Sequence, residues 1–379
     1  MTRLLRWPLD QRCPVDSMDI VGRLSLITRN VEEIITPDEI RDLLATSPRP
    51  KAYWGFECSG MMHLGMGLIC GRKIKDLVEA GFEFTIFLAD WHSLINNKLG
   101  GDMEKIKFCG GYFRECFTSL GLDPQKVRYV WASDLAEKVD YWEKVVRIAK
   151  SASVNRVLRA LPIMGRSLSE AEIEAAALIY PCMQAADIFQ MNIDIACSGI
   201  DQRKAHMLAR EAADKMGWRK PACIHTPLLT GLTGPAETPR GEFDEDKEMN
   251  MRIGAKMSKS IAGSSILIHD MPEEIRQKIK NAFCPPKEVR ANPLIEIVRY
   301  IILPEKGTIQ IPRPPKYGGD LVFKDCGNLE SEYLKGSIHP LDLKNAVAEE
   351  LVAILEPVRE HFRRNPRTLE GMKKLEITR

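Results

Sequence analysis

The chain has 379 residues, 44% hydrophobic and 28% charged, values typical of a folded protein with two or three domains. Its 54 basic and 52 acidic residues give a net charge of +2, so any nucleic-acid contact must depend on local basic patches. The ten cysteines form no C-x-x-C pair, and no apolar run approaches the length of a membrane span. This composition argues against a zinc site, a disulfide framework and a membrane protein, and it predicts a reducing, cytoplasmic location.

The first part of the chain alternates between predicted strands and helices. After an extension of about 17 residues, the run Thr36-Pro37-Asp38-Glu39 has the pattern of a capped helix start. Strands are predicted at 52–56, 84–88, 127–131, 193–196 and 222–225, and helices at 64–80, 103–120, 137–160, 170–191 and 202–215. Such alternation indicates an α/β fold with a parallel sheet covered by helices on both faces. Ligands of these sheets bind at the carboxyl ends of the strands.

The pattern changes in the second part. Residues 234–250 hold six acids and two bases, which indicates a solvated acidic insertion. Beyond residue 270 the predicted elements are helices, at 272–283, 293–303 and 341–359, so we place a domain boundary there. The tail from residue 362 is basic and is expected to be disordered.

Two short motifs, almost 200 residues apart, indicate phosphate chemistry. Lys256-Met257-Ser258-Lys259-Ser260 places two mobile ammonium groups in a glycine-flanked loop that can reach a triphosphate. The turn after the first strand carries Gly60, His63 and Gly65 at a helix start, where backbone N–H groups can meet phosphate oxygens. Taken singly, each motif has a plain alternative: a basic surface loop for the first and an ordinary tight turn for the second.

A third feature is a polar stripe on an otherwise apolar helix. Tyr180, Gln184 and Asp187 are spaced four and three residues apart, so they share one helix face. Polar groups in apolar surroundings are costly unless they are bonded to something. The stripe therefore indicates either a ligand pocket or a buried network satisfied by other protein groups.

These features together carry a family resemblance. The lysine run resembles the KMSKS loop of class I aminoacyl-tRNA synthetases, and His63-Leu64-Gly65-Met66 resembles their His-x-Gly-His turn, with Met66 replacing the second histidine. The polar stripe and residues 52–57, 199–204 and 339–344 resemble tyrosyl-tRNA synthetases of the archaeal and eukaryotic type. The likeness covers about residues 30–360, except for the acidic insertion.

The resemblance implies two domains. Residues 1–270 would form a Rossmann-type catalytic domain, with a connecting insertion at about 110–170 and the lysine loop at 254–262. Residues 271–379 would form an α-helical anticodon-binding domain ending in the basic tail.

The same resemblance implies roles for individual residues. Tyr53 and Asp187 would hold the phenol hydroxyl of tyrosine, and Tyr180, Gln184 and Gln202 its α-amino group. His63, Lys256 and Lys259 would be catalytic. The implied ATP-binding residues are Gly55, Gly65, Met66, Lys256, Met257, Ser258, Lys259 and Ser260, and the implied tRNA-binding residues are Arg203, Lys204, Tyr317, His339 and Asp342.

The implied reaction is ATP-dependent activation of tyrosine to tyrosyl-adenylate, followed by transfer to the 3′ end of tRNA(Tyr). Mg²⁺ would arrive with ATP, the protein itself would hold no metal, and the enzyme would be a cytoplasmic homodimer. Three alternatives stay open: a tryptophanyl-tRNA synthetase, a non-catalytic RNA-binding paralogue and another nucleotidyltransferase. Met66 in place of the second histidine leaves the non-catalytic paralogue as an alternative, because a thioether cannot donate a hydrogen bond.

Overall fold

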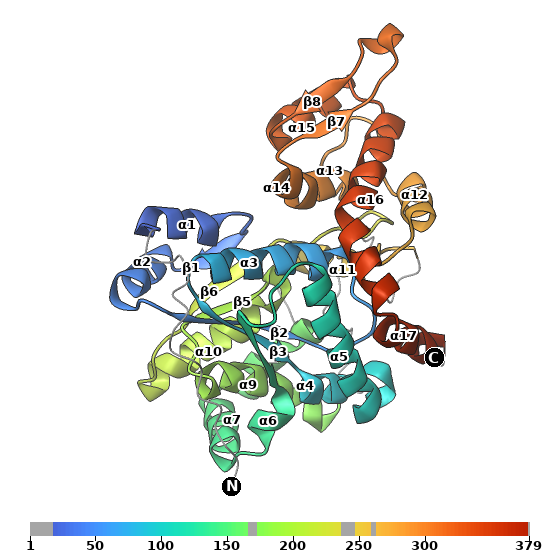
Figure 1. Ribbon diagram of the computed structural model, residues 1–379. Helices are drawn as coiled ribbons and strands as arrows, with labels where there is room; N and C mark the ends of the chain where they lie inside the picture. Colours follow the sequence, from blue (N-terminus) through green and yellow to red (C-terminus); the bar gives the residue numbers. More distant parts are fainter. Residues whose placement is uncertain (1–17, 166–172, 236–246, 259–262, 378–379) are drawn as a thin grey trace.

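The computed structural model describes residues 18–165, 173–235, 247–258 and 263–377 (Figure 1). In the first part of the chain one sheet is built from β1 (Glu33–Ile35), β2 (Lys51–Phe56), β3 (Glu83–Leu88), β4 (Val127–Trp131), β5 (Ile195–Gly199) and β6 (Ala222–Thr226). The strand order is β1-β6-β5-β2-β3-β4. β1 runs antiparallel to β6, and every other neighbouring pair is parallel. The predicted α/β fold is thereby confirmed, and the chain order reverses between β2 and β5, where ligands of such sheets bind.

Alternate residues of β2 belong to two different cores, because side chains of a strand point to opposite faces. Trp54 and Phe56 pack in the core that contains α3 (Gly71–Glu79) and α5 (Met103–Ser119). Tyr53 faces the other core, with α7 (Val139–Ser151), α9 (Ala175–Gln190) and α10 (Arg203–Met216). Tyr53 is therefore on the same side of the sheet as α9, the helix that carries the polar stripe.

Several helices of the first part differ from their predicted bounds. The helix predicted at 137–160 is two helices, because Ser153 caps the start of α8 (Val154–Leu158) by accepting a hydrogen bond from the Arg156 N–H. The helix predicted at 64–80 begins as a π-helical turn, η2 (Gly65–Cys70), before α3. The remaining helices of this part are α1 (Ile20–Thr28), α2 (Pro37–Thr46), α4 (Asp90–Ile95), η3 (Lys98–Gly101), α6 (Ala132–Ala136), η4 (Leu161–Met164), η6 (Ile200–Gln202) and α11 (Lys247–Ala255).

Two of these elements fall in predicted insertions. α11 occupies the end of the predicted acidic insertion and continues to Ala255, directly before the lysine run. β4 falls within the range 110–170 suggested for the connecting insertion, yet it is the edge strand of the sheet. The predicted extension at residues 1–17 and most of the acidic insertion lie outside the described residues.

The second part of the chain is mainly helical, as predicted, with a small antiparallel ribbon that the sequence did not indicate. The ribbon pairs β7 (Ile309–Ile311) with β8 (Leu321–Phe323). The helices are α12 (Pro272–Asn281), α13 (Pro293–Ile297), η7 (Val298–Ile302), α14 (Leu303–Lys306), η8 (Pro315–Tyr317), α15 (Cys326–Lys335), α16 (Pro340–Arg364) and α17 (Arg367–Ile377). Buried residues of both parts belong to one continuous hydrophobic core.

The expectation of a disordered tail is wrong for residues 367–377. α17 lies beside α5 (Figure 1), with Met372 fully buried and the Cα of Gly371 close to the Phe108 ring. Leu369, Met372 and Leu375 give the helix an apolar face at spacings of three residues. Burial of that face orders a segment whose basic composition alone suggested disorder.

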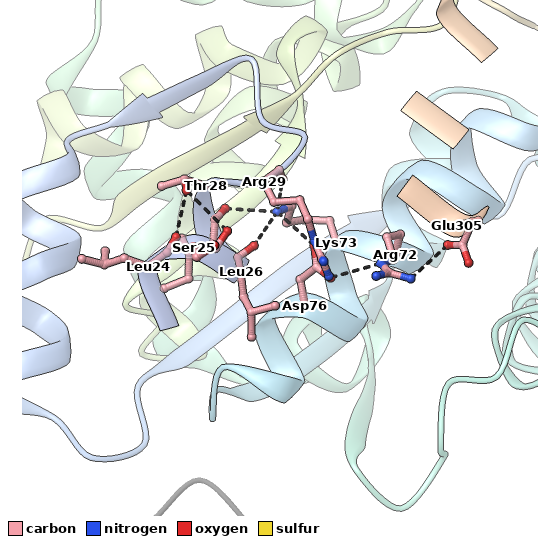
Figure 2. Close-up of polar contacts among 10 residues, drawn as sticks. Leu24, Ser25, Leu26, Thr28, Arg29, Arg72, Lys73, Asp76 and Glu305 are labelled. Atoms are coloured by element: carbon pink, nitrogen blue, oxygen red, sulfur yellow. Dashed lines mark hydrogen bonds and ion pairs between the residues drawn. The ribbon is translucent and has the colours of Figure 1, made fainter. Parts of the chain in front are cut away.

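A buried charge network joins α1 to α3 and reaches the second part (Figure 2). The Lys73 ammonium donates to the carbonyls of Leu26, Ile27 and Arg29 at the end of α1, and it pairs with Asp76. Burial lowers the pKa of Lys73, and the neighbouring carboxylate of Asp76 opposes that shift. Arg72, 3.3 Å from Asp76, extends the network to Glu305 on α14 at 3.4 Å. Removing Lys73 or Asp76, the buried pair of this network, costs about 3–5 kcal/mol.

Among the helices of the described residues, none combines the length and the apolar character that a membrane crossing requires.

Candidate functional site

A cavity of about 770 Å³ opens at the carboxyl ends of the central strands, within the usual size range of ligand sites. It is bordered by the ends of β2, β3, β5 and β6 and by one face of α9. The predicted tyrosine and ATP residues that line it are Tyr53, Gly55, His63, Gly65, Met66, Tyr180, Gln184, Asp187, Gln202, Lys256, Met257 and Ser258. Lys259 and Ser260 lie outside the described residues.

Asp187 forms the buried polar centre of this cavity. Its Oδ1 accepts a hydrogen bond from the Tyr141 hydroxyl at 2.9 Å, and its Oδ2 lies 3.2 Å from His92 Nε2. The Asp187 side chain is only 2% exposed, so these partners carry most of its stabilisation. Burial, and then the Asp187 charge, raise the pKa of Tyr53 well above its ordinary value. Tyr53 therefore keeps its proton and can donate a hydrogen bond into the cavity.

His92 balances the charge of this centre. Burial lowers the pKa of its imidazole, but the charges of Asp187, Glu57 and Asp90 outweigh that effect and leave the pKa above its ordinary value. His92 Nε2 lies within ion-pair distance of Asp187 Oδ2, and the pair is charged when the imidazole is protonated. The His92 ring also packs edge-on against Phe87 and Tyr180. The raised pKa favours the protonated imidazole beside the Asp187 carboxylate.

The two glutamines form a second polar group in the cavity. Gln184 Nε2 donates to Gln202 Oε1 at 3.3 Å, and Gln202 Nε2 donates to the Ile163 carbonyl at 2.9 Å. Gln184 Oε1 is buried and has no hydrogen-bond partner among the described residues. The Tyr180 hydroxyl donates to Glu57 Oε1 at 2.7 Å. This arrangement leaves acceptor oxygens that suit a positively charged amino group.

The lysine run begins in a fixed position. Lys256 Nζ contacts Asp201 Oδ2 at 2.6 Å, and the backbone of Lys256 bridges to Thr230. Burial raises the pKa of Asp201, but the Lys256 ammonium outweighs it, so the pKa falls below its ordinary value. Met257 is buried, and its N–H donates to the Leu229 carbonyl at 2.6 Å. The first lysine is thus held as an ion pair at the edge of the cavity.

The histidine turn and the chain that follows the lysine run lie against each other. His63 bridges to Leu267, and the Leu64 N–H donates to the Ile266 carbonyl at 3.0 Å. Gly67 permits this approach, since a Cβ there would lie 2.5 Å from Ile268 Cγ2. The two motifs, far apart in sequence, therefore border the same cavity.

Several polar residues of the site have no role in the sequence-based assignment, among them Glu57, His92, Asn96, Tyr141 and Asp201. Glu57 carried a usable signal, because a carboxylate directly after a central strand of a parallel sheet lies at its ligand-binding edge. Asn96 Nδ2 donates to Glu57 Oε1 at 2.7 Å. Tyr141 carried no signal in the sequence, because its position depends on the packing of α7 against α9.

The predicted tRNA-binding residues lie outside the cavity. Arg203 Nε donates to both carboxylate oxygens of Glu33 at 2.9 Å, which gives Arg203 a structural partner in β1. Lys204 follows it in the first turn of α10. In the second part, Tyr317 is exposed at η8, while His339 caps α16 and Asp342 lies in its first turn.

Comparisons with known proteins identify the family to which this chain belongs. The family model for class I tRNA synthetases (W and Y) matches residues 46–236 and 248–356. The tyrosine–tRNA ligase of Saccharolobus islandicus is 48% identical over 94% of this chain and 98% of the relative. That of Aeropyrum pernix is 47% identical over 90% and 93%. The tyrosyl-tRNA synthetase of Pyrococcus horikoshii, solved with L-tyrosine, superposes with a TM-score of 0.86 at 44% identity, covering 94% of this chain and all of that one. The chain therefore belongs to the tyrosyl-tRNA synthetases of the archaeal and eukaryotic type, within the class I synthetase family.

Proposed function

We propose that this chain joins tyrosine to tRNA(Tyr) in two steps at the described cavity. The tyrosine carboxylate attacks the α-phosphate of ATP, which gives tyrosyl-adenylate and releases pyrophosphate. The tyrosyl group then passes to the terminal ribose hydroxyl of the tRNA, and AMP leaves. The observation that carries the proposal is the buried Asp187 carboxylate and the Tyr53 hydroxyl in one cavity with the lysine run.

The polar centre suits a phenol. The tyrosine hydroxyl would donate to Asp187 as a further donor beside the Tyr141 hydroxyl, and it would accept a hydrogen bond from Tyr53. Phenylalanine offers no such donor, so a buried carboxylate would lose one partner when it binds. An indole carries its single donor at a different position in a larger ring, which disfavours the tryptophanyl alternative.

The other end of the amino acid would meet the second polar group. Its α-ammonium can donate to the open Gln184 Oε1, to Gln202 and to the Tyr180 hydroxyl oxygen. These three side chains come from α9 and from the end of η6, directly before α10. Held at both ends, the substrate keeps its carboxylate in one position for attack.

Catalysis in this proposal consists of positioning and charge stabilisation. ATP would enter as its Mg²⁺ complex, with its phosphates between the His63 turn and the lysine run. Lys256 would exchange its ion pair with Asp201 for the phosphate chain as negative charge moves to the leaving pyrophosphate. Gly55, Gly65 and Met66 border the space left for the nucleotide, and Lys259 would act with Lys256.

Further parts of the proposal concern tRNA, assembly and location. Arg203 and Lys204 would approach the acceptor end, although Arg203 would first have to yield part of its contact with Glu33. Tyr317, His339 and Asp342 would read the anticodon by stacking and by hydrogen bonds to base edges. A homodimer follows from the family resemblance alone, and a cytoplasmic location from the pattern of cysteines.

A charging assay tests the function. The chain is incubated with ATP, Mg²⁺, an archaeal tRNA pool and radiolabelled tyrosine, and acid-precipitable label is counted. We expect label in tRNA that depends on ATP and is undiminished by excess unlabelled tryptophan. Absence of charging, or charging with labelled tryptophan instead, would contradict the proposal. A chain that binds tRNA without charging it would favour the non-catalytic paralogue suggested by Met66.

A further inference from the structure

One short segment holds both ends of the lysine loop. We call Leu229–Leu232 the bracing segment. The Leu229 carbonyl accepts from the Met257 N–H at 2.6 Å, and the Gly231 N–H donates to the Ala255 carbonyl at 2.8 Å, both at the beginning of the loop. After the loop, the Ser264 carbonyl accepts from the Leu232 N–H at 2.8 Å. Leu229 and Leu232 are buried, so the segment is anchored in the core.

The fit at Gly231 is close. A Cβ at this position would lie 2.2 Å from Ser264 Oγ, a distance that real contacts do not allow. The bracing segment therefore lies directly against the chain on the far side of the loop. A shift of this segment would move both ends of the loop together.

The second part of the chain holds the bracing segment through Glu296. On α13, Glu296 Oε2 accepts a hydrogen bond from the Thr230 N–H at 2.6 Å, and Oε1 accepts one from the Thr230 hydroxyl at 2.9 Å. Burial raises the pKa of Glu296, and the bonds from Thr230 act against that rise. The neighbours Leu294, Ile295 and Ile297 are fully buried, which fixes the helix that presents the carboxylate.

We infer that Glu296 is a positioning residue for Lys256, the first lysine of the lysine run. Thr230 is bonded to Glu296 on one side and bridges to the backbone of Lys256 on the other. A single residue, Thr230, thus connects the Glu296 carboxylate to Lys256. Lys256 is the lysine that would neutralise the phosphates. Glu296 does not line the cavity, so it acts through the bracing segment and not on the substrates. Groups that stabilise charge must be held closely in place, and a misplacement of about 1 Å costs about 100-fold in rate.

The inference rests on the proposed function, and its first test is kinetic. Glu296→Ala removes both acceptors from Thr230. We expect the single-turnover rate of tyrosyl-adenylate formation to fall by about 10- to 100-fold. The Kd for tyrosine, measured by calorimetry without ATP, should stay unchanged, because none of the side chains assigned to tyrosine belongs to the bracing segment. Glu296→Gln should restore most of the rate, since its amide can accept from the Thr230 N–H and donate to the hydroxyl.

The matched control is Glu305→Ala. Glu305 is also a second-part carboxylate that contacts the first part, but it pairs with Arg72 at 3.4 Å and not with the bracing segment. We expect this variant to keep the wild-type rate. Equal slowing of both variants would show a general effect of contact between the two parts and would overturn the inference. So would a Glu296→Ala enzyme of normal rate, or one whose tyrosine Kd rises in proportion to the loss of rate.

A second measurement needs no reaction. Hydrogen exchange at the amides of Met257, Gly231 and Leu232 reports the braced contacts directly. We expect Glu296→Ala to speed exchange at these amides and to leave the amides of α5 unchanged. Unchanged exchange at the bracing segment would overturn the inference. If exchange changes as expected while the wild-type chain forms no tyrosyl-adenylate, the proposed function fails and the structural role of Glu296 stands.

Discussion

Replacing Asp187 by alanine tests how the cavity selects a phenol. The carboxylate is buried and has two partners in the protein, the Tyr141 hydroxyl at 2.9 Å and His92 Nε2 at 3.2 Å. In the substrate complex the tyrosine hydroxyl would be a third. A hydrogen bond to a charged group contributes about 1.5–3 kcal/mol, which corresponds to about 12- to 150-fold in kcat/KM. We therefore expect Asp187→Ala to lower kcat/KM for tyrosine by about 12- to 150-fold.

For phenylalanine, we expect Asp187→Ala to raise kcat/KM or to leave it unchanged. In the wild-type cavity the phenylalanine ring would face a carboxylate to which it donates nothing, and in the variant that carboxylate is gone. The ratio of kcat/KM for tyrosine to kcat/KM for phenylalanine should therefore fall by about 12- to 150-fold. Pyrophosphate exchange into ATP, run with each amino acid in turn, measures both values. The ratio is independent of the fraction of folded enzyme, which matters because the change strips His92 of its ion-pair partner.

Tyr141→Phe is the matched control for this experiment. It removes the 2.9 Å hydrogen bond to Asp187 and leaves the carboxylate in place. We expect this variant to keep its preference for tyrosine. An Asp187→Ala enzyme that still preferred tyrosine by the wild-type ratio would refute the reasoning, because the discrimination would then reside elsewhere in the cavity.

Three further outcomes follow from the same geometry. Lys256→Ala or Lys259→Ala should nearly abolish adenylate formation in single-turnover assays while tyrosine still binds, and an unchanged rate would contradict the role of the loop. Met66→His should raise the rate of adenylate formation, because an imidazole can donate a hydrogen bond where a thioether cannot; an equal or lower rate would count against it. Burial lowers the pKa of His269 to about 4, so the unfolded chain takes up its proton first as the pH falls below about 6.5. The resulting stability is present above pH 6.5 and is lost towards pH 4. Between pH 7 and pH 5, the free energy of unfolding measured in urea should fall by about 2 kcal/mol more for wild type than for His269→Gln. Equal decreases in the two proteins would refute this.

The sequence predicted best those features that depend on local pattern. β3 was predicted within one residue because Phe84–Leu88 is an unbroken buried run, as expected for a parallel strand covered on both faces. The motif residues were expected near one another, and those described border one cavity.

Features that depend on long-range packing were missed. β1 has only three residues and is defined by its pairing with β6, a strand far later in the chain. Tyr141 and Asp201 acquire their roles from contacts with Asp187 and Lys256, which no local pattern reveals. α17 was missed for a different reason, since its apolar face was visible at spacings of three residues but its basic side chains suggested a solvated tail.

Amino-acid-dependent pyrophosphate exchange is the sharpest test of the proposed function, because it isolates the activation step at the Asp187 cavity. The chain is supplied with ATP, Mg²⁺ and labelled pyrophosphate, and with tyrosine, tryptophan or phenylalanine in separate reactions. We expect rapid exchange with tyrosine and little with the other two amino acids. Exchange with tryptophan in preference to tyrosine, or none with any of the three, would contradict it.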